Sequence, residues 1–319
     1  MLTYIVPFIV LILVVVFIHE YGHYYFARKY GVGVTDFSIG FGQEIFGWND
    51  KHGTRWKICW IPLGGYVKFF GDRNVFSQAD HEKILKQYNK EDQERLFVIK
   101  PLYQRALIVF GGPLANFLLA IVIFFSIYTF IGKDFTPAVI NEVQKDSPAM
   151  IGGLKNNDII LEIDGNKVES IMDVSKFITT STGDLIDFKV ERSNQEYLVK
   201  IKPDIVLSDD NLGNKINKRM VGIKLGAYNN EINHVKLGPA KALIHSVKEV
   251  YFVSASSLKY IGSMLRGSGD SSQLGGPIRI AKITGQVAEI GILPFISIMA
   301  YISISLGLIN LFPIPMLDG

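Results

Sequence analysis

Apolar positions are concentrated in three long runs, at about residues 3–24, 106–132 and 290–317, and the second and third runs contain no charged residue. A helix of about 20 apolar residues crosses the hydrocarbon core of a bilayer, so each run predicts a membrane-spanning helix. The corresponding segments are residues 1–27, 105–132 and 290–319. Residues 1–18 contain no basic residue and lead straight into His19 and Glu20 instead of a small-residue cleavage site. This favours a retained span over a signal peptide.

The region between the first two runs, residues 28–104, has a different pattern. Residues 55–69 alternate between polar and apolar positions, include the turn signal Gly64-Gly65, and lie close to three tryptophans. Alternation predicts a β-strand, and tryptophan prefers the membrane–water interface. We therefore expect a membrane-associated β-hairpin in this region.

Basic residues at the ends of the spans predict the orientation of the chain. Arg28 and Lys29 follow the first run, Lys100 and Arg105 precede the second, and no Lys or Arg occurs before residue 28. Cytoplasmic loops carry an excess of such residues, so we expect the hairpin region on the cytoplasmic side. The N-terminus and the region after Gly132 then lie outside, which is the periplasm in a bacterium.

After the second run, residues 133–206 consist of short strand-like stretches separated by Gly and Asp, which predicts a β-rich domain. The stretches Ser147-Pro148-Ala149, Gly153-Leu154 and Asp158-Ile159-Ile160 resemble a bacterial PDZ domain. The resemblance implies that backbone N–H groups near Leu154 receive the C-terminus of a peptide, which adds a strand to a sheet edge. The alternative is a structural β-domain without a peptide ligand.

Residues 207–289 combine a polar connector containing short strands with one amphipathic helix. Apolar residues recur at helical spacing over 238–266, while Lys248, Glu249 and Lys259 lie on other faces. Charges in the middle of the segment argue against a span. We expect a helix on the outer surface of the membrane.

Composition agrees with a membrane protein of two or three structural parts. Of 319 residues, 48% are hydrophobic, and the mean hydropathy is +0.24. The formal charge is +3 with basic residues spread along the chain, which gives no support for nucleic-acid binding. The single cysteine, Cys59, can form neither an internal disulfide nor a Cys-x-x-Cys metal site, and we interpret it as a packing residue.

The first span carries the clearest candidate chemistry, the sequence His19-Glu20-Tyr21-Gly22-His23. Positions i and i+4 lie on one face of a helix, so both imidazoles can bind one cation, with Glu20 beside them to accept a proton from water. A carboxylate within an apolar span costs about 2.5 to 3.5 kcal/mol on insertion scales, which indicates a functional role. The alternatives are coincidence or two histidines with structural roles.

A catalytic zinc site needs a third protein ligand and leaves a fourth position open. Asp318 is an isolated carboxylate at the end of the third run, within the stretch Asn310 to Gly319. Two imidazoles and one carboxylate form an established catalytic zinc set, so Asp318 is the candidate ligand. An ordinary aspartate at a helix end is the alternative, and a plain kink is the alternative for Pro313 and Pro315. Gly111, Gly112 and Asn116 are interpreted mainly as close-packing positions that also support the zinc site.

These motifs together, in this order, resemble the site-2 protease family of intramembrane metalloproteases, peptidase family M50B. Within it, the similarity is to the bacterial regulator-of-sigma-E type, also called RIP metalloproteases, here with a single PDZ domain. The resemblance implies Zn2+ bound by His19, His23 and Asp318, with Glu20 as general base and Asn310 on the substrate backbone or the oxyanion. It also implies structural support from Gly112, Asn116, Pro313 and Pro315, and a hairpin that clamps an unwound substrate through Gly64, Gly65, Tyr66, Val67 and Lys68.

The fold implied is a polytopic α-helical membrane protein with an inserted periplasmic, β-rich PDZ-like domain. Three spans are present, and a fourth span, usual in the family, is expected beyond Gly319 in a longer chain. The implied partners are the lipid bilayer and single-span membrane proteins, such as anti-sigma factors or remnant signal peptides. The implied location is the bacterial inner membrane, with the zinc site near the cytoplasmic side. The alternative function is a non-catalytic scaffold that presents a periplasmic peptide-binding domain, and metal transport is a weaker third.

Overall fold

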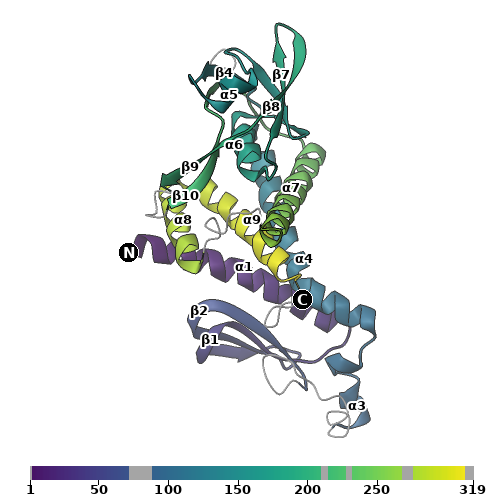
Figure 1. The fold of residues 1–319 in the computed structure, drawn as a ribbon. Helices are drawn as coiled ribbons and strands as arrows, with labels where there is room; N and C mark the ends of the chain where they lie inside the picture. Colours follow the sequence, from purple (N-terminus) through teal and green to yellow (C-terminus); the bar gives the residue numbers. More distant parts are fainter. Residues whose placement is uncertain (1, 72–87, 210–214, 228–231, 268–275, 313–319) are drawn as a thin grey trace. The chain divides into compact units, whose positions relative to one another are not determined.

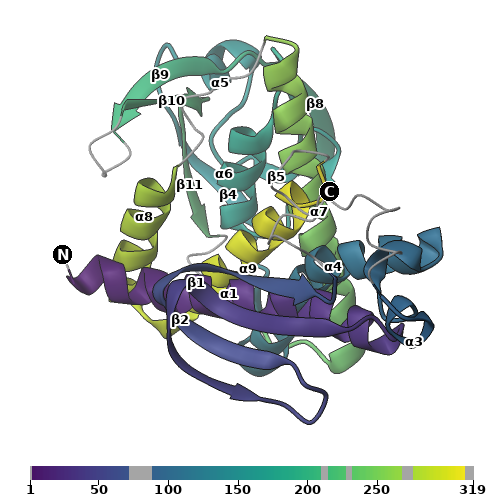
Figure 2. The ribbon, with the colours of Figure 1, turned by 90° about the horizontal axis from the view of Figure 1, so that it is seen from below.

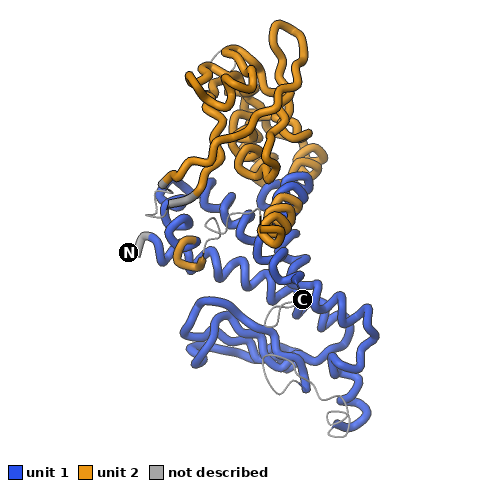
Figure 3. The backbone as a smooth tube through the Cα atoms, viewed as in Figure 1, with its two compact units in different colours: residues 1–124, 246–254, 280–319 blue, residues 125–245, 255–279 orange. Residues whose placement is uncertain are grey.

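The computed structural model of the protein describes residues 2–71, 88–209, 215–227, 232–267 and 276–312 (Figure 1). The chain forms two compact units, each built from segments that are far apart in the sequence (Figure 3). The first unit comprises residues 1–124, 246–254 and 280–319, and the second comprises residues 125–245 and 255–279.

Three helices in the described part of the chain are long and apolar enough to cross a membrane: Tyr4–Lys29, Leu102–Ile131 and Ile292–Ile309. They correspond to α1 (Leu2–Lys29), to α4 (Leu102–Ser126) with the π-helical turn Ile127–Ile131, and to α9 (Ile292–Ile309). This confirms the prediction of a membrane protein with three apolar helices. Basic residues occupy the last turn of α1, where they stabilise the negative end of the helix dipole.

In the first unit, a small sheet follows α1. It consists of β1 (Val34–Asn49) and β2 (Arg55–Phe69), which pair antiparallel and run alongside α1 (Figures 1 and 2). The pairing is irregular. Residues 34–39 of β1 pair with residues 65–69 of β2 on one side and with residues 55–58 of β2 on the other. Residues 44–49 of β1 pair with residues 55–59 of β2. Among the described residues, 65–69 pairs on one side only, so this stretch is an edge of the sheet.

A small apolar core lies where the sheet begins. Ala27, Val32, Val34 and Ile108 are buried there, and Val67, Phe69 and Phe97 pack against them. The chain then passes through α3 (Lys90–Gln93) and a 3-10 turn (Phe97–Ile99) into α4. This core joins the end of α1, the edge of the sheet and the start of α4.

The second unit contains the predicted β-rich domain. Its main sheet has the order β11-β4-β5-β7-β8, with β6 paired to β5, and α5 packs against β8 while α6 packs against β5. The elements are β4 (Ala138–Val143), α5 (Pro148–Gly152), β5 (Ile159–Ile163), β6 (Asn166–Lys167), α6 (Ile171–Thr180), β7 (Ile186–Arg192), β8 (Gln195–Ile201) and β11 (Ile223–Ala227). Two further pairs are β9 (Asp204–Asp209) with β10 (Lys215–Met220), and β3 (Lys133–Asp134) with β12 (His234–Val235).

The structure corrects two predicted boundaries. The main sheet does not end at residue 206, because β11 returns to pair with β4, about 80 positions earlier in the chain. Such a pairing leaves no local trace in the pattern of polar and apolar residues. The region predicted as a connector with one helix contains two helices, α7 (Pro239–Leu265) and α8 (Pro277–Ile290).

Candidate active site

The two histidines of the motif lie side by side on α1. His19 and His23 are 4% and 6% exposed, and their Nε2 atoms are 3.3 Å apart. A tetrahedral ion with nitrogen ligands at about 2.0–2.1 Å requires those nitrogens to be about 3.3–3.4 Å apart. The observed separation therefore fits two ligands of one zinc ion.

A hydrogen bond fixes the tautomer of His23. Its Nδ1 lies 2.8 Å from the main-chain oxygen of Ile108 in α4. A carbonyl oxygen only accepts, so Nδ1 must carry the proton and Nε2 keeps its lone pair for a metal. Such a bond to the second nitrogen also holds the ring of a metal-binding histidine in place.

Asn116 plays the corresponding part for His19. The Nδ2 atom of Asn116 lies 3.0 Å from Nδ1 of His19, and the Oδ1 atom of Asn116 is buried without a partner among the described residues. A half-turn rotation of the amide exchanges these atoms and lets Oδ1 accept a hydrogen bond from Nδ1–H of His19. His19 then has the same metal-binding tautomer as His23. In that orientation the side-chain oxygen of Asn116 has a partner, and it holds the His19 ring as the Ile108 carbonyl holds the His23 ring.

Glycines allow α4 to approach the histidines closely. A Cβ atom at Gly112 would lie 2.7 Å from Nε2 of His19 and closer still to Nε2 of His23. A Cβ atom at Gly111 would lie 2.7 Å from the main-chain oxygen of Gly22 in α1. Backbones of membrane helices pack this closely only at small residues. The two glycines therefore place α4 against the metal-binding face of α1.

Helix α9 supplies the third side of this site. Asn310 is the C-cap of α9, is 8% exposed, and has its Nδ2 atom 2.9 Å from Nε2 of His19. The hydroxyl of Ser303 donates to the main-chain oxygen of Asn116 at 2.9 Å, and Gly307 lies against Pro113 and Asn116. The amide of Asn310 thus lies beside the ring nitrogen of His19 that a cation would bind.

Sequence reasoning did not single out Ser303 or Gly307. With Asn310 they lie at spacings of four and three residues, which places them on one face of an otherwise apolar helix. That stripe of small and polar residues could have identified the face that packs on α4. The carbonyl of Ile108, in contrast, carries no signal in the sequence.

Three predicted site residues, Pro313, Pro315 and Asp318, lie outside the described residues. Within the described part, His, Cys, Asp and Glu form no group of three that could hold a metal ion. The third ligand therefore stays a prediction. The described residues supply two nitrogen ligands and the amides around them.

Glu20 lies against the small sheet. A Cβ atom at Gly65 would lie 3.1 Å from Cγ of Glu20 and 3.1 Å from Cγ1 of Val16. Gly64, with φ of +129°, adopts a backbone conformation that favours glycine, and a side chain there would collide with Phe41. Residues 65–68 of the predicted substrate hairpin lie in the edge stretch of β2, and Gly65 is next to the predicted base.

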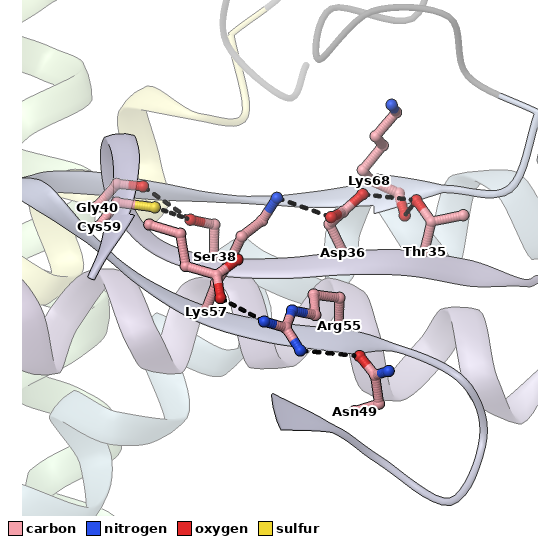
Figure 4. A network of polar contacts seen from close by, with 10 residues as sticks. Thr35, Asp36, Ser38, Gly40, Asn49, Arg55, Lys57, Cys59 and Lys68 are labelled. Atoms are coloured by element: carbon pink, nitrogen blue, oxygen red, sulfur yellow. Dashed lines mark hydrogen bonds and ion pairs between the residues drawn. The ribbon is translucent and has the colours of Figure 1, made fainter. Parts of the chain in front are cut away.

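Polar contacts hold this sheet together (Figure 4). Lys57 pairs with Asp36 at 2.7 Å, and the hydroxyl of Thr35 donates to the carboxylate of Asp36 at 2.9 Å. Burial alone would raise the pKa of Asp36, but the hydrogen bonds from Lys57 and Thr35 outweigh it and lower that pKa. Cys59 is buried with its Sγ atom 3.3 Å from the Ser38 hydroxyl, which is consistent with a packing residue. These contacts link the strands that lie next to the edge beside Glu20.

In the second unit, the predicted peptide-carboxylate loop is wrong as placed. The N–H groups of Gly153 and Leu154 donate to the main-chain oxygen of Ala149, and that of Lys155 donates to the Asp158 carboxylate at 2.9 Å. These bonds are made because Gly153 is the C-cap of α5 and closes its last turn. The N–H groups of this loop are already used within the domain.

Two imidazoles with their Nε2 atoms together and a carboxylate in the same turn, on a helix long and apolar enough to cross a membrane, are typical of a membrane zinc metallopeptidase. The model of peptidase family M50 matches residues 7–319, and the chain belongs to that family. It is therefore a zinc metalloprotease of the site-2 protease type.

The similarity to known proteins extends over nearly the whole chain. The protein is 40% identical over 316 residues to "Putative zinc metalloprotease Atu1380" of Agrobacterium fabrum, covering 99% of this chain and 84% of that one. It is 33% identical over 327 residues to "Metalloprotease MmpA" of Caulobacter vibrioides, covering 96% and 81%. Among solved structures, the PDZ domain of the SdrC-like protein of Listeria monocytogenes is 25% identical with a TM-score of 0.24, covering 28% of this chain and 88% of that one.

Proposed function

We propose that the protein is an intramembrane endopeptidase that cuts peptide bonds within the membrane-spanning segments of single-span proteins. Anti-sigma factors and remnant signal peptides are the expected substrates, in regulated intramembrane proteolysis. The observation that carries the proposal is the Nε2–Nε2 distance of 3.3 Å between His19 and His23 on a helix that can span the membrane. A metal site at that depth suits a substrate that is itself in the bilayer.

In this proposal His19, His23 and Asp318 hold the zinc ion, which when bound lowers the pKa of a coordinated water to about 7. Glu20 accepts the proton of the attacking water as the oxygen bonds to the scissile carbonyl carbon. As the C–N bond breaks, Glu20 returns that proton to the leaving amine. Asn310, with its amide 2.9 Å from His19, is placed to donate to the oxyanion.

The edge of β2 presents the substrate to Glu20. A membrane-spanning substrate hides its peptide bonds in helical hydrogen bonds, so it must unwind locally before attack. Residues 65–69 pair with the sheet on one side only in the described structure, and Gly65 lies next to Glu20. An unwound substrate strand that pairs with this edge has its freed backbone groups satisfied beside the base.

Exposed apolar side chains on β1 and β2 favour contact of this sheet with lipid. Among these side chains, the exposed fraction is 61% for Phe46, 67% for Trp60 and 52% for Ile61. Soluble proteins rarely expose a contiguous patch of this kind, and tryptophan suits the interface. With the basic residues that flank the spans, this favours a sheet at the cytoplasmic side of a bacterial inner membrane, and a PDZ-like domain in the periplasm.

For the PDZ-like domain we propose that a peptide C-terminus docks at the start of β11. Within the described residues, Val221 and Gly222 donate no backbone hydrogen bond, while their carbonyls accept from Ala149 and Gln144. Gly222 has φ of +79°, and successive N–H groups around such a residue form an anion-binding concavity. β11 is an edge of its sheet, so a peptide can extend it. Peptides with a free C-terminus should bind, and the same peptides with a C-terminal amide should not.

The test of the enzymatic proposal is the Glu20→Gln variant of the purified protein with a tagged single-span substrate. Loss of the base should abolish cleavage while zinc content is unchanged. Glu91→Gln is the matched control, because Glu91 is an exposed glutamate on α3. Cleavage by Glu20→Gln at the control rate would rule the proposal out, and a protein that binds peptide but never cleaves would favour the scaffold.

A further inference from the structure

The turn between β1 and β2 is tied to α1 through one carboxylate. Asp50 accepts hydrogen bonds from the Tyr24 hydroxyl at 2.8 Å, the Trp56 indole at 3.1 Å, and the N–H groups of His52 at 2.8 Å and Thr54 at 2.9 Å. Burial alone would raise the pKa of Asp50, but these four bonds outweigh it and lower that pKa to about 2. The carboxylate is therefore ionised at neutral pH, and both of its oxygens are occupied.

The Tyr24 end of this tie belongs to the catalytic helix. Tyr24 follows His23 directly and lies four residues after Glu20, so Glu20 and Tyr24 share the face of α1 that meets the sheet. The Tyr24 ring packs edge-on against Phe37 at 5.8 Å and Trp56 at 5.3 Å, between ring centroids. The sheet thus contacts α1 at two levels one turn apart, at Gly65 beside Glu20 and at Asp50 on Tyr24.

Two strand pairings connect the turn that contains Asp50 to residues 65–69. Trp56 is paired with Phe37, and Phe37 is paired on its other side with Val67. The rings of Phe37 and Trp56 also stack at 4.1 Å. A shift of the turn relative to α1 is therefore transmitted to residues 65–69 and changes the position of the edge relative to Glu20.

We propose that Asp50 and Tyr24 are positioning residues for the peptidase reaction, which set the distance between the substrate-binding edge of β2 and Glu20. The inference rests on the proposed function, because it assumes that the edge holds the substrate. Neither residue touches substrate or metal. Their effect is on the geometry of attack, to which turnover is sensitive: a misplacement of about 1 Å can cost about 100-fold in rate.

The test compares Tyr24→Phe, Asp50→Asn and the double variant with wild type, using a tagged single-span substrate in detergent. Tyr24→Phe removes only the hydroxyl and keeps the ring against Phe37 and Trp56. Tyr25→Phe is the matched control, since it removes a hydroxyl from the neighbouring ring, which is 52% exposed. Zinc content and melting temperature are measured for each variant.

Each single variant should lower kcat by about 10-fold or more, with KM changed by less than about 2-fold and zinc content unchanged. The double variant should be no slower than the slower single variant, because both changes break the same contact. A kcat close to wild type in either single variant would overturn the inference. So would a loss in the double variant equal to the product of the single losses, which indicates two independent structural effects.

A second measurement does not depend on activity. Spin labels at Tyr21 and Leu63, which are 44% and 52% exposed, report the distance between α1 and β2 in a Cys59→Ala background. The distance distribution should broaden or shift in Tyr24→Phe and Asp50→Asn, and stay unchanged in Tyr25→Phe. An unchanged distribution in all three rejects the positioning role. If wild type and Glu20→Gln are equally inactive, the proposed function has failed. The spin-label result still tests whether the Asp50–Tyr24 contact sets the distance between β2 and α1.

Discussion

Replacing Gly112 with alanine should remove zinc from the site without unfolding the protein. The added Cβ would lie 2.7 Å from Nε2 of His19, whereas ordinary van der Waals contact begins at 3.4 Å. The ring must therefore move by at least 3.4 − 2.7 = 0.7 Å, and the His23 ring by more. Metal–ligand distances tolerate deviations of only about 0.2 Å. The rings cannot retreat freely, because Asn116 and the Ile108 carbonyl hold their Nδ1 atoms.

Displacement of both ligands should cost at least as much as the loss of an outer-shell partner, about 100-fold in zinc affinity or ~2.7 kcal/mol. Helix propensity changes in the opposite direction, because alanine is up to about 1 kcal/mol better than glycine within a helix. Zinc affinity is measured by competition with a chelator, and folding by thermal unfolding. Gly262→Ala is the control, since a Cβ there meets only the Arg266 side chain, at 3.9 Å. A Gly112→Ala protein with wild-type zinc affinity would refute the assignment of this face of α4 to the metal site.

Three further predictions concern contacts that lie within one unit or the other. Ser303→Ala removes the hydrogen bond to the main-chain oxygen of Asn116 and should lower the free energy of unfolding by about 1 kcal/mol, seen in thermal unfolding. Arg192 donates to the buried Asp158 carboxylate through two contacts of 2.7 Å. Asp158→Ala leaves Arg192 without this partner, so it should lower the free energy of unfolding by about 3 kcal/mol and make the second unit sensitive to protease. The Asp50 pKa of about 2 lies below the ordinary value, so its contribution to stability is complete above about pH 4 and is lost as pH falls through about 2. The melting-temperature difference between wild type and Asp50→Asn should shrink over that range, and a difference that grows would contradict it.

Local pattern predicted the parts of this fold whose signals are local. The alternation from Arg55 to Phe69 predicts a strand that coincides with β2, and the three apolar runs predict the three membrane helices. The contacts that orient the candidate site are not local. Asn116 and Asn310 reach His19 across 97 and 291 positions of the chain. No periodicity records such a pairing, so the sequence alone could mark both asparagines as candidates but could not show which histidine nitrogen each one faces.

The same limit explains the error in the PDZ-like domain. The stretch around Leu154 has the glycine expected of an anion-binding loop, but the N–H groups there close the end of α5. Gly222 has an equally suitable backbone conformation, and its neighbourhood keeps N–H groups available among the described residues, because β11 starts there at a sheet edge. Whether a glycine turn can bind an anion depends on where its N–H groups already donate, and this is a property of the fold.

The metal ligands and the predicted base lie on two different faces of α1. Mutations that affect metal affinity can therefore be separated from mutations that affect turnover. His19 and His23 face α4 and α9, whose glycines and asparagines fix the imidazoles, while Glu20 faces the edge of β2. Changes on the α4 and α9 side should therefore reduce metal affinity, with turnover falling in proportion to the metal lost. Changes in the sheet should leave the metal in place and reduce turnover of the loaded enzyme. A sheet variant that lost zinc as readily as Gly112→Ala would show that the two faces are coupled through α1 itself.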